Sequence, residues 1–256
     1  METYRRLNVF TICLNGLPWI TMHHARLESL KIPWNWTIVH GIADPKADTA
    51  WCNPLETVAH DETLGYLRRL RDRDNRVTLI EQERWHGKKT MCNAALETFK
   101  EQGMLLQMDA DEVWSERQLQ LMPSLFEAYP EADCAFFLAR VWVGPNRYTC
   151  QPGGWANRDY EWLRLWKWEP GRFFETHEPP RLAGQNKVIK KTHTAMLGLV
   201  FDHYSYVFRD QIAFKEKYYG KLWSVAAWES LQTMRGPVEL KAVLPFVDSE
   251  TMSFEL

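Results

Sequence analysis

The stretch LLQMDADEVW, residues 105–114, sets an apolar run directly before three carboxylates. The leucines and the methionine are typical of a strand inside a sheet, whereas Asp109 and Asp111 are not. Side chains at positions i and i+2 of a strand point the same way, so these two aspartates can converge on one point. Converging carboxylates repel unless a proton or a metal ion offsets their charge, and oxygen ligands favour Mg²⁺ or Mn²⁺ over zinc. The pattern therefore predicts a site for a hard divalent ion at a strand end.

The composition is that of a folded protein with one large domain. The chain has 256 residues, of which 45% are hydrophobic and 25% are charged. Its net charge of −2 gives no reason to expect nucleic acid or an anionic membrane surface as the main partner. We expect a single domain over residues 1–256, with a nucleotide-binding half at 1–130 and an acceptor-binding half at 131–256.

The cysteines and the N-terminus predict a cytoplasmic location. The five cysteines are widely spaced and contain no CxxC pair, which is typical of a reduced, intracellular protein. The N-terminal METYRRLNVF lacks a hydrophobic signal region, and no apolar run approaches the ~18–20 residues of a membrane span. Peripheral association with a membrane through partners remains compatible with this pattern.

Strand and helix patterns alternate over the first half of the chain. The strand candidates are 7–14, 36–43, 77–82 and 104–109, and the helix candidates are 18–31, 55–73, 88–102 and 115–129. This order predicts an α/β fold, a Rossmann-type, mostly parallel sheet flanked by helices. Ligands of such sheets bind outside the carboxyl ends of the strands, so the side chains that follow those ends should line one edge.

The second half has a different pattern and predicts an elaborated acceptor side. Residues 134–143 form a strong strand candidate, and 153–168 suggest strands or a hairpin. Residues 209–234 predict one long helix, and 238–247 a last strand or an irregular tail. Many of the thirteen tryptophans lie in this half. We interpret most of them as core residues and leave one or two for a groove that stacks on sugar rings.

The first half resembles the nucleotide-sugar glycosyltransferases of the GT-A fold, in particular the broad family 2 group. The resemblance covers residues 7 to about 143 by the order of elements. The segments that carry the resemblance most specifically are FTICLNG (10–16), GKKTMCNAAL (87–96) and MDADEVW (108–114), the last of which contains an Asp-x-Asp motif. It implies a metal-dependent hexosyltransferase-type enzyme that takes a nucleotide-sugar donor, with a UDP sugar expected, and a carbohydrate or other hydroxyl acceptor.

The resemblance also implies roles for individual residues. Asp109 and Asp111 would hold the Mn²⁺ or Mg²⁺ ion that grips the donor diphosphate, with His203 as a further ligand and His193 behind it. The donor itself would lie against a second set of residues. That set is Thr11, Asn15 and Asp44 near the nucleoside, with Lys88 and Asn93 facing the donor.

A rigid segment in the second half offers a general base. THEPPRL (176–182) presents Glu178 before two stiff prolines, and an inverting transferase needs a carboxylate to take the proton of the acceptor hydroxyl. Glu178 is the first candidate. Asp159 and Glu161, after the Gly-rich stretch GGWANRDYE, are alternatives. Three residues of the long predicted helix, Lys215, Lys217 and Tyr218, could reach a phosphate, although a solvated helix face is the simpler interpretation.

Two other functions fit parts of the pattern. A nucleotidyltransferase shares the sheet order and the paired carboxylates, but it would normally carry a basic, Gly-rich loop after the first strand, where this chain has LNGLPW. A non-enzymatic carbohydrate-binding protein would explain the tryptophans, but it gives no reason for a strand that ends in Asp-x-Asp.

Overall fold

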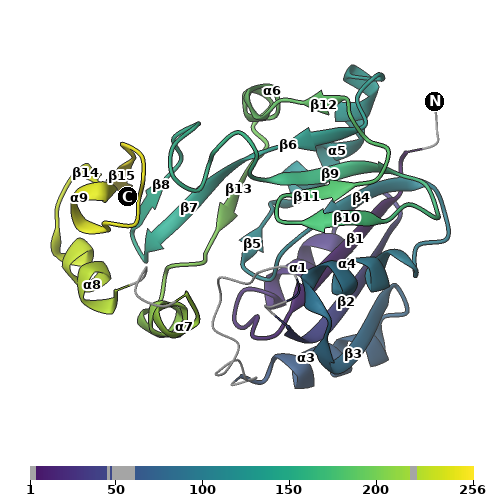
Figure 1. Ribbon diagram of the computed structural model, residues 1–256. Helices are drawn as coiled ribbons and strands as arrows, with labels where there is room; N and C mark the ends of the chain where they lie inside the picture. The colour runs from purple at the N-terminus through teal and green to yellow at the C-terminus, as the bar shows by residue number, and fades with distance from the viewer. Residues whose placement is uncertain (1–3, 45–46, 48–60, 220–223) are drawn as a thin grey trace.

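The computed structural model describes residues 4–44, 47, 61–219 and 224–256 (Figure 1). Its larger sheet has seven strands in the order β12-β6-β9-β4-β1-β2-β3. These strands are β1 (Leu7–Cys13), β2 (Trp34–Ala43), β3 (Val77–Trp85), β4 (Gly103–Gln107), β6 (Cys134–Phe136), β9 (Leu163–Trp168) and β12 (Val188–Ile189). Only β9 runs antiparallel to its neighbours, so the prediction of a mostly parallel sheet is confirmed.

Helices and a hairpin cover both faces of this sheet. Leucines and other apolar residues of α1 (Thr21–Glu28), α3 (Thr63–Arg73) and α5 (Glu116–Ala128) share one core cluster with Met104 and Leu106 of β4. Leu105 points to the opposite cluster, which contains α4 (Gly87–Leu96) and the hairpin of β10 (Phe174–His177) and β11 (Pro180–Leu182). A strand buried on both faces explains why 104–106 is continuously apolar.

A second, mostly antiparallel sheet extends the molecule on the side of the C-terminus (Figure 1). Its order is β14-β15-β8-β7-β13-β5, with β5 (Glu112–Val113), β7 (Leu138–Gly144), β8 (Arg147–Thr149), β13 (Val200–His203), β14 (Val238–Glu239) and β15 (Met252–Glu255). The helices of this half are α6 (Lys191–Met196), α7 (Arg209–Tyr219), α8 (Val225–Thr233) and α9 (Leu240–Val243). The second half therefore extends the first sheet, through β6, β9 and β12, and builds most of the second sheet, to which the first half adds β5.

Several predicted boundaries in the first half were wrong. The helix expected at 18–31 begins at Thr21, and the one expected at 88–102 ends at Leu96. Gly103 begins β4, where an added Cβ would lie 2.6 Å from the carbonyl oxygen of Arg6. The glycine allows two backbone segments to approach closely at this point. Residues 55–60 of the second predicted helix lie outside the described residues.

In the second half three predicted elements are divided or shortened. Residues 134–143 form β6 and β7, which belong to different sheets, with the fully buried Phe137 between them. The helix predicted at 209–234 is two helices, because Ser224 has an extended backbone and caps α8 through the amide of Ala227. The strand of 153–168 begins only at Leu163, and 238–247 divides between β14 and α9.

Among the described residues no helix combines the length and the apolar character needed to cross a membrane.

The start of α5 is fixed by a capping box. The Ser115 hydroxyl accepts a hydrogen bond from the Gln118 amide at 3.2 Å, and the Gln118 side chain accepts one from the Ser115 amide at 2.7 Å.

We expect Ser115→Ala to lower the free energy of unfolding by about 1 kcal/mol, because an amide at the helix start loses its partner. Urea denaturation measures the change. Ser29→Ala, at an exposed site after α1, is the control, and equal losses in the two variants would contradict the assignment.

Candidate active site

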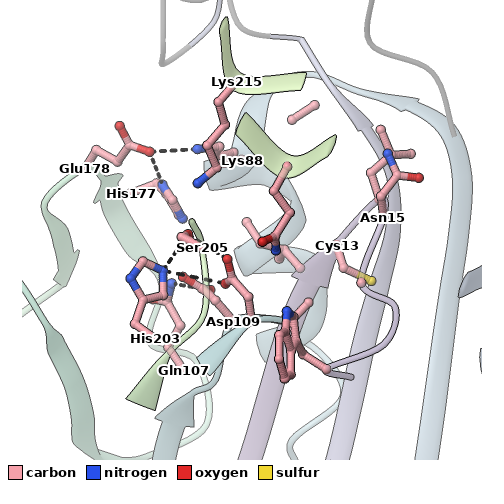
Figure 2. A pocket seen from close by; sticks show the side chains of 18 of the residues that line it. Cys13, Asn15, Lys88, Gln107, Asp109, His177, Glu178, His203, Ser205 and Lys215 are labelled. Atoms are coloured by element: carbon pink, nitrogen blue, oxygen red, sulfur yellow. Dashed lines mark hydrogen bonds and ion pairs between the residues drawn. The ribbon is translucent and has the colours of Figure 1, made fainter. Parts of the chain in front are cut away.

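One cavity of about 740 Å³ lies beyond the carboxyl ends of β1 and β4 (Figure 2). The loop after β1 contributes Asn15, and the turn after β4 contributes Asp109 and Asp111. Side chains from four other elements complete the lining. They are Lys88 of α4, Glu178 of the β10–β11 turn, His203 of β13 and Lys215 of α7. The sheet edge predicted to hold the ligand therefore borders a cavity that both halves of the chain line.

The acidic segment lies in a turn, not in the strand. β4 ends at Gln107, and the turn is closed by the Glu112 amide on the carbonyl of Asp109 at 3.0 Å. The turn is anchored through Met108, whose amide donates to Phe10 at 3.0 Å and whose carbonyl accepts from the Thr11 hydroxyl at 2.6 Å. Both aspartates line the cavity, but the strand geometry expected for them was wrong, and their carboxylates contact different partners.

Arg164 of β9 neutralises the buried part of the acidic segment. Its guanidinium contacts the Glu112 carboxylate at 2.7 Å and Asp109 Oδ2 at 3.0 Å, and it is almost fully buried. Burial by itself lowers the pKa of Arg164, but the two carboxylates outweigh it and raise that pKa. Glu112 has no exposed surface, and its burial raises its pKa against the pull of Arg164. Arg164 is therefore the counter-charge of the buried carboxylates, and its contacts hold the turn in place.

Asp109 is already engaged on both carboxylate oxygens. Gln107 Nε2 donates to Oδ1 at 3.0 Å, and Arg164 donates to Oδ2. Of the two aspartates, Asp111, two residues further along the turn, is therefore the one whose charge Arg164 does not share.

Asp111 and His203 meet at the cavity because β13 pairs with β5, which sets His203 opposite Glu112. Asp111 Oδ1 lies 3.7 Å from His203 Nε2, and Ser205 Oγ contacts both side chains, at 2.7 Å from Asp111 Oδ2 and 2.9 Å from the ring nitrogen (Figure 2). Burial lowers the pKa of His203 to about 4, so the imidazole is neutral at pH 7, as a metal ligand must be. Burial opposes the charge on Asp111, but His203, Lys215 and Ser205 outweigh it and lower the pKa.

This pair has the donor chemistry of a divalent-ion site. A carboxylate beside a neutral imidazole suits Mn²⁺, and Mg²⁺ is held in many enzymes by one or two carboxylates together with substrate phosphates. Within the described residues no group of three or more His, Cys, Asp or Glu side chains is placed to hold an ion. The residues therefore fit an ion for which a bound ligand would supply the remaining oxygens.

Two lysines and one glutamate occupy the opposite side of the cavity. Lys88 Nζ lies 2.7 Å from Glu178 Oε1, and His177 Nδ1 lies 3.6 Å from the same oxygen (Figure 2). Lys215 also lines the cavity, and burial lowers its pKa to about 8 against the attraction of Asp111. Lys215 is therefore a cation in the cavity, not a member of a solvated helix face as the simpler interpretation expected.

Four of the predicted site residues do not line the cavity. Thr11 is fully buried, and its hydroxyl bonds Met108 and the indole of Trp36. Asn93 fastens α4 to β10 through the amide and the carbonyl of Phe174, at 2.7 and 3.2 Å. Asp44 lies just after β2, next to the lining residue Ala43. The side chain of Asp159 is fully exposed, 3.7 Å from Lys191.

The two remaining candidates are Glu161, the other possible base, and His193, the second possible metal ligand. Glu161 lines the cavity, and its burial raises its pKa; one carboxylate oxygen accepts from the Arg158 amide at 2.6 Å. His193 stacks on Tyr129 at 5.5 Å, away from the acidic turn.

Sequence analysis missed Arg164 and Ser205. In LRLWKW (163–168) a charged residue alternates with apolar ones on a strand, which is a signal for an inward-facing arginine with a buried partner. The sequence gives no comparable signal for Ser205, because its contact to Asp111 depends on the pairing of β13 with β5.

Aromatic side chains form part of the cavity wall. Trp19 stacks between Tyr204 at 4.2 Å and Phe208 at 5.5 Å, and both Trp19 and Phe208 line the cavity. Trp162 lies 4.8 Å from the ring of His203 and beneath the Arg164 guanidinium at 5.0 Å. The tryptophans Trp155, Trp166 and Trp168 are buried, which fits the interpretation of most indoles as core.

Comparison with known proteins identifies the fold. No protein-family model and no curated protein matches the sequence. The mannosyltransferase PcManGT from Pyrobaculum calidifontis, solved with GDP-Man and Mn²⁺, matches 96% of this chain and 68% of its own, with 16% identity and a TM-score of 0.50. TarS from S. aureus matches at 12% identity and a TM-score of 0.49; the match covers 89% of this chain but only 42% of TarS. The chain therefore has a GT-A-like glycosyltransferase fold, as its sequence predicted.

The buried Arg164 pair leads to a test of stability. We expect Arg164→Met to lower the free energy of unfolding by about 3 kcal/mol at neutral pH, because Glu112 and Asp109 lose their shared counter-charge. The loss should shrink as the pH falls, since a protonated Glu112 needs no partner. Urea denaturation at several pH values measures this.

The matched control is Arg140→Met, since the side chain of Arg140 is 41% exposed and pairs with the partly exposed Asp202. We expect it to cost less than about 1 kcal/mol at any pH. An Arg164→Met loss as small as the control loss would show that the guanidinium is not needed by the buried carboxylates.

Proposed function

We propose that this protein is a glycosyltransferase that moves a sugar from a nucleoside-diphosphate donor, with a UDP sugar expected, to a hydroxyl group of a carbohydrate or other acceptor. One observation carries the proposal: a single cavity holds the Asp111–His203 pair, two lysines and a glutamate near an aromatic wall. The GT-A-like fold supports it. Products in glycan or polysaccharide synthesis fit this chemistry.

A Mn²⁺ or Mg²⁺ ion would be held by Asp111 and His203, with Asp109 adding negative charge beside it. When bound, the ion supplies Lewis-acid stabilisation of the negative charge that develops on a leaving diphosphate. Lys215 and Lys88 line the same cavity, so their ammonium groups add positive charge where the phosphates would lie. Asn15, in the loop after β1, is placed to contact the nucleoside.

Three of the residues that the family resemblance assigned to donor binding do not line the cavity. The contacts of Thr11 support a role in positioning the acidic turn. The contacts of Asn93 support a role in positioning α4 against the hairpin. Asp44 follows the strand that brings Gly41 and Ala43 to the cavity, which keeps it a candidate at the nucleoside end.

Glu178 is the proposed general base, since it lines the cavity whereas Asp159 does not. Its carboxylate takes the proton of the acceptor hydroxyl as that oxygen's electron pair forms the bond to the anomeric carbon. The bond from the anomeric carbon to the donor phosphate oxygen breaks, and its electron pair leaves with the diphosphate. Glu161 is the alternative in the cavity, and its raised pKa favours proton acceptance.

The two rival functions predict different binding. A nucleotidyltransferase would release pyrophosphate from a nucleoside triphosphate, and the loop Leu14–Leu17 at this cavity carries no basic side chain to hold one. A carbohydrate-binding protein would bind glycans through the aromatic wall without metal or nucleotide.

We expect Asp111→Ala to weaken metal-dependent UDP binding by more than about 100-fold, because the change removes the carboxylate that would hold the ion. Calorimetric titration of UDP with Mn²⁺, and then with EDTA, measures the affinity; GDP and TDP test the nucleotide class. Asp72→Ala, at a 66%-exposed position of α3, should bind UDP like the wild type. Unchanged UDP affinity in Asp111→Ala would refute the metal assignment, and binding that ignores EDTA would refute metal dependence.

We expect Glu178→Gln to bind UDP at least as tightly as the wild type does and to lose about 10²- to 10⁴-fold in kcat, because the amide cannot accept the proton. A transfer assay with the UDP sugar identified by binding measures the turnover. Asp159→Asn serves as the comparison, and its turnover should remain normal. Full turnover by Glu178→Gln would move the base to Glu161, or to Asp159 if only that variant is inactive.

A further inference from the structure

An ion pair between Lys88 and Glu178 lies on the side of the cavity opposite the acidic turn. Lys88 lies in the first turn of α4, and Glu178 in the turn between β10 and β11. Their side chains are 24% and 37% exposed, and the 2.7 Å distance is that of a charge-assisted hydrogen bond. The pair is therefore formed in the protein without a donor, in the space that the donor and the acceptor would share.

The neighbours of Glu178 make it a weak base. Burial by itself would raise the pKa of the carboxyl, but His177 and Lys88 outweigh it and lower that pKa to about 2. These are the charged or titratable groups that face Glu178 from α4 and from its own hairpin. A carboxylate that holds its charge so firmly has little tendency to take a proton from a hydroxyl group.

Lys88 has a second anion within its reach if the cavity holds a donor. Lys88 and Lys215 line the same cavity, and they are close enough for Lys88 to lower the pKa of Lys215. The first turn of α4 adds the partial positive charge of a helix N-terminus. A diphosphate carries more negative charge than one carboxylate, so it competes well for Lys88.

We propose that Lys88 exchanges partners when the donor binds, leaving Glu178 for the donor diphosphate and so releasing the carboxylate to accept the acceptor proton. This inference rests on the proposed transfer function and adds a coupling to it: the base becomes effective only after the donor is in place. Lys88 is then a positioning residue that sets the order of events, donor before acceptor.

The test follows the Glu178 carboxyl carbon by NMR in the full-length protein labelled with ¹³C at glutamate side chains. The resonance is assigned by its absence in Glu178→Gln, and the probe is UDP with diamagnetic Mg²⁺. Without UDP we expect no titration of Glu178 above about pH 4, whereas with UDP the midpoint should reach or exceed the ordinary glutamate value of about 4.3.

Lys88→Gln supplies the second arm, with Lys89→Gln as the matched control, because Lys89 is exposed and does not line the cavity. In Lys88→Gln the Glu178 midpoint should already be raised without UDP, and UDP should move it less than in the wild type. Lys89→Gln should behave as the wild type.

The outcomes separate the two proposals. If UDP shifts other resonances and the Glu178 midpoint stays low, or if Lys88→Gln shows the full wild-type shift, partner exchange is overturned and the transfer function stands. If UDP with Mg²⁺ shifts no resonance at all, both proposals are overturned. A midpoint that rises with UDP in the wild type and is already raised in Lys88→Gln establishes the exchange.

Discussion

The candidate site depends on the positive charge of the Arg164 guanidinium, which offsets the negative charge of the acidic turn. Three carboxylates follow one another within four residues, and their mutual repulsion would force the turn open without a counter-charge. Arg164 neutralises the buried Glu112 and holds Asp109, so the turn keeps its shape and Asp111 alone projects unshared charge toward His203. Because Arg164 lies on β9 and Glu112 on β5, the same contact ties the larger sheet to the smaller one.

The alternation of elements and the edge that carries the site could be predicted from the sequence, because both follow from local pattern. A strand covered on both faces is predominantly apolar, as LNVFTIC and GMLLQ are, and the polar residues after such strands gather at one edge. The contacts that fix the site could not be predicted this way. Arg164 and Ser205 reach the acidic turn across 55 and 94 residues of chain, and only strand pairing brings them there.

Elements of the second half were predicted less well because a hydrophobic pattern does not specify which sheet a residue joins. The run CAFFLARVWV is suited to a strand throughout, yet the chain changes sheets at Phe137, whose amide bonds the Trp162 carbonyl at 3.0 Å. Polar residues present the same difficulty. Thr11 and Asn93 occupy positions typical of ligand contacts, but their side chains satisfy buried backbone groups, a role that depends on partners distant in the sequence.

The distribution of charge suggests why the cavity suits a ligand that is itself strongly charged. Asp111 and His203 offer two ligating groups, too few to enclose a divalent ion, while Lys88 and Lys215 offer positive charge that no single carboxylate balances well. A diphosphate satisfies both sides at once, since its oxygens complete the ion's coordination and its negative charge neutralises the lysines. In the proposed donor complex, ion, diphosphate and lysines would therefore stabilise one another. Such mutual dependence favours the assembled donor complex over binding of a free ion or of an uncharged sugar.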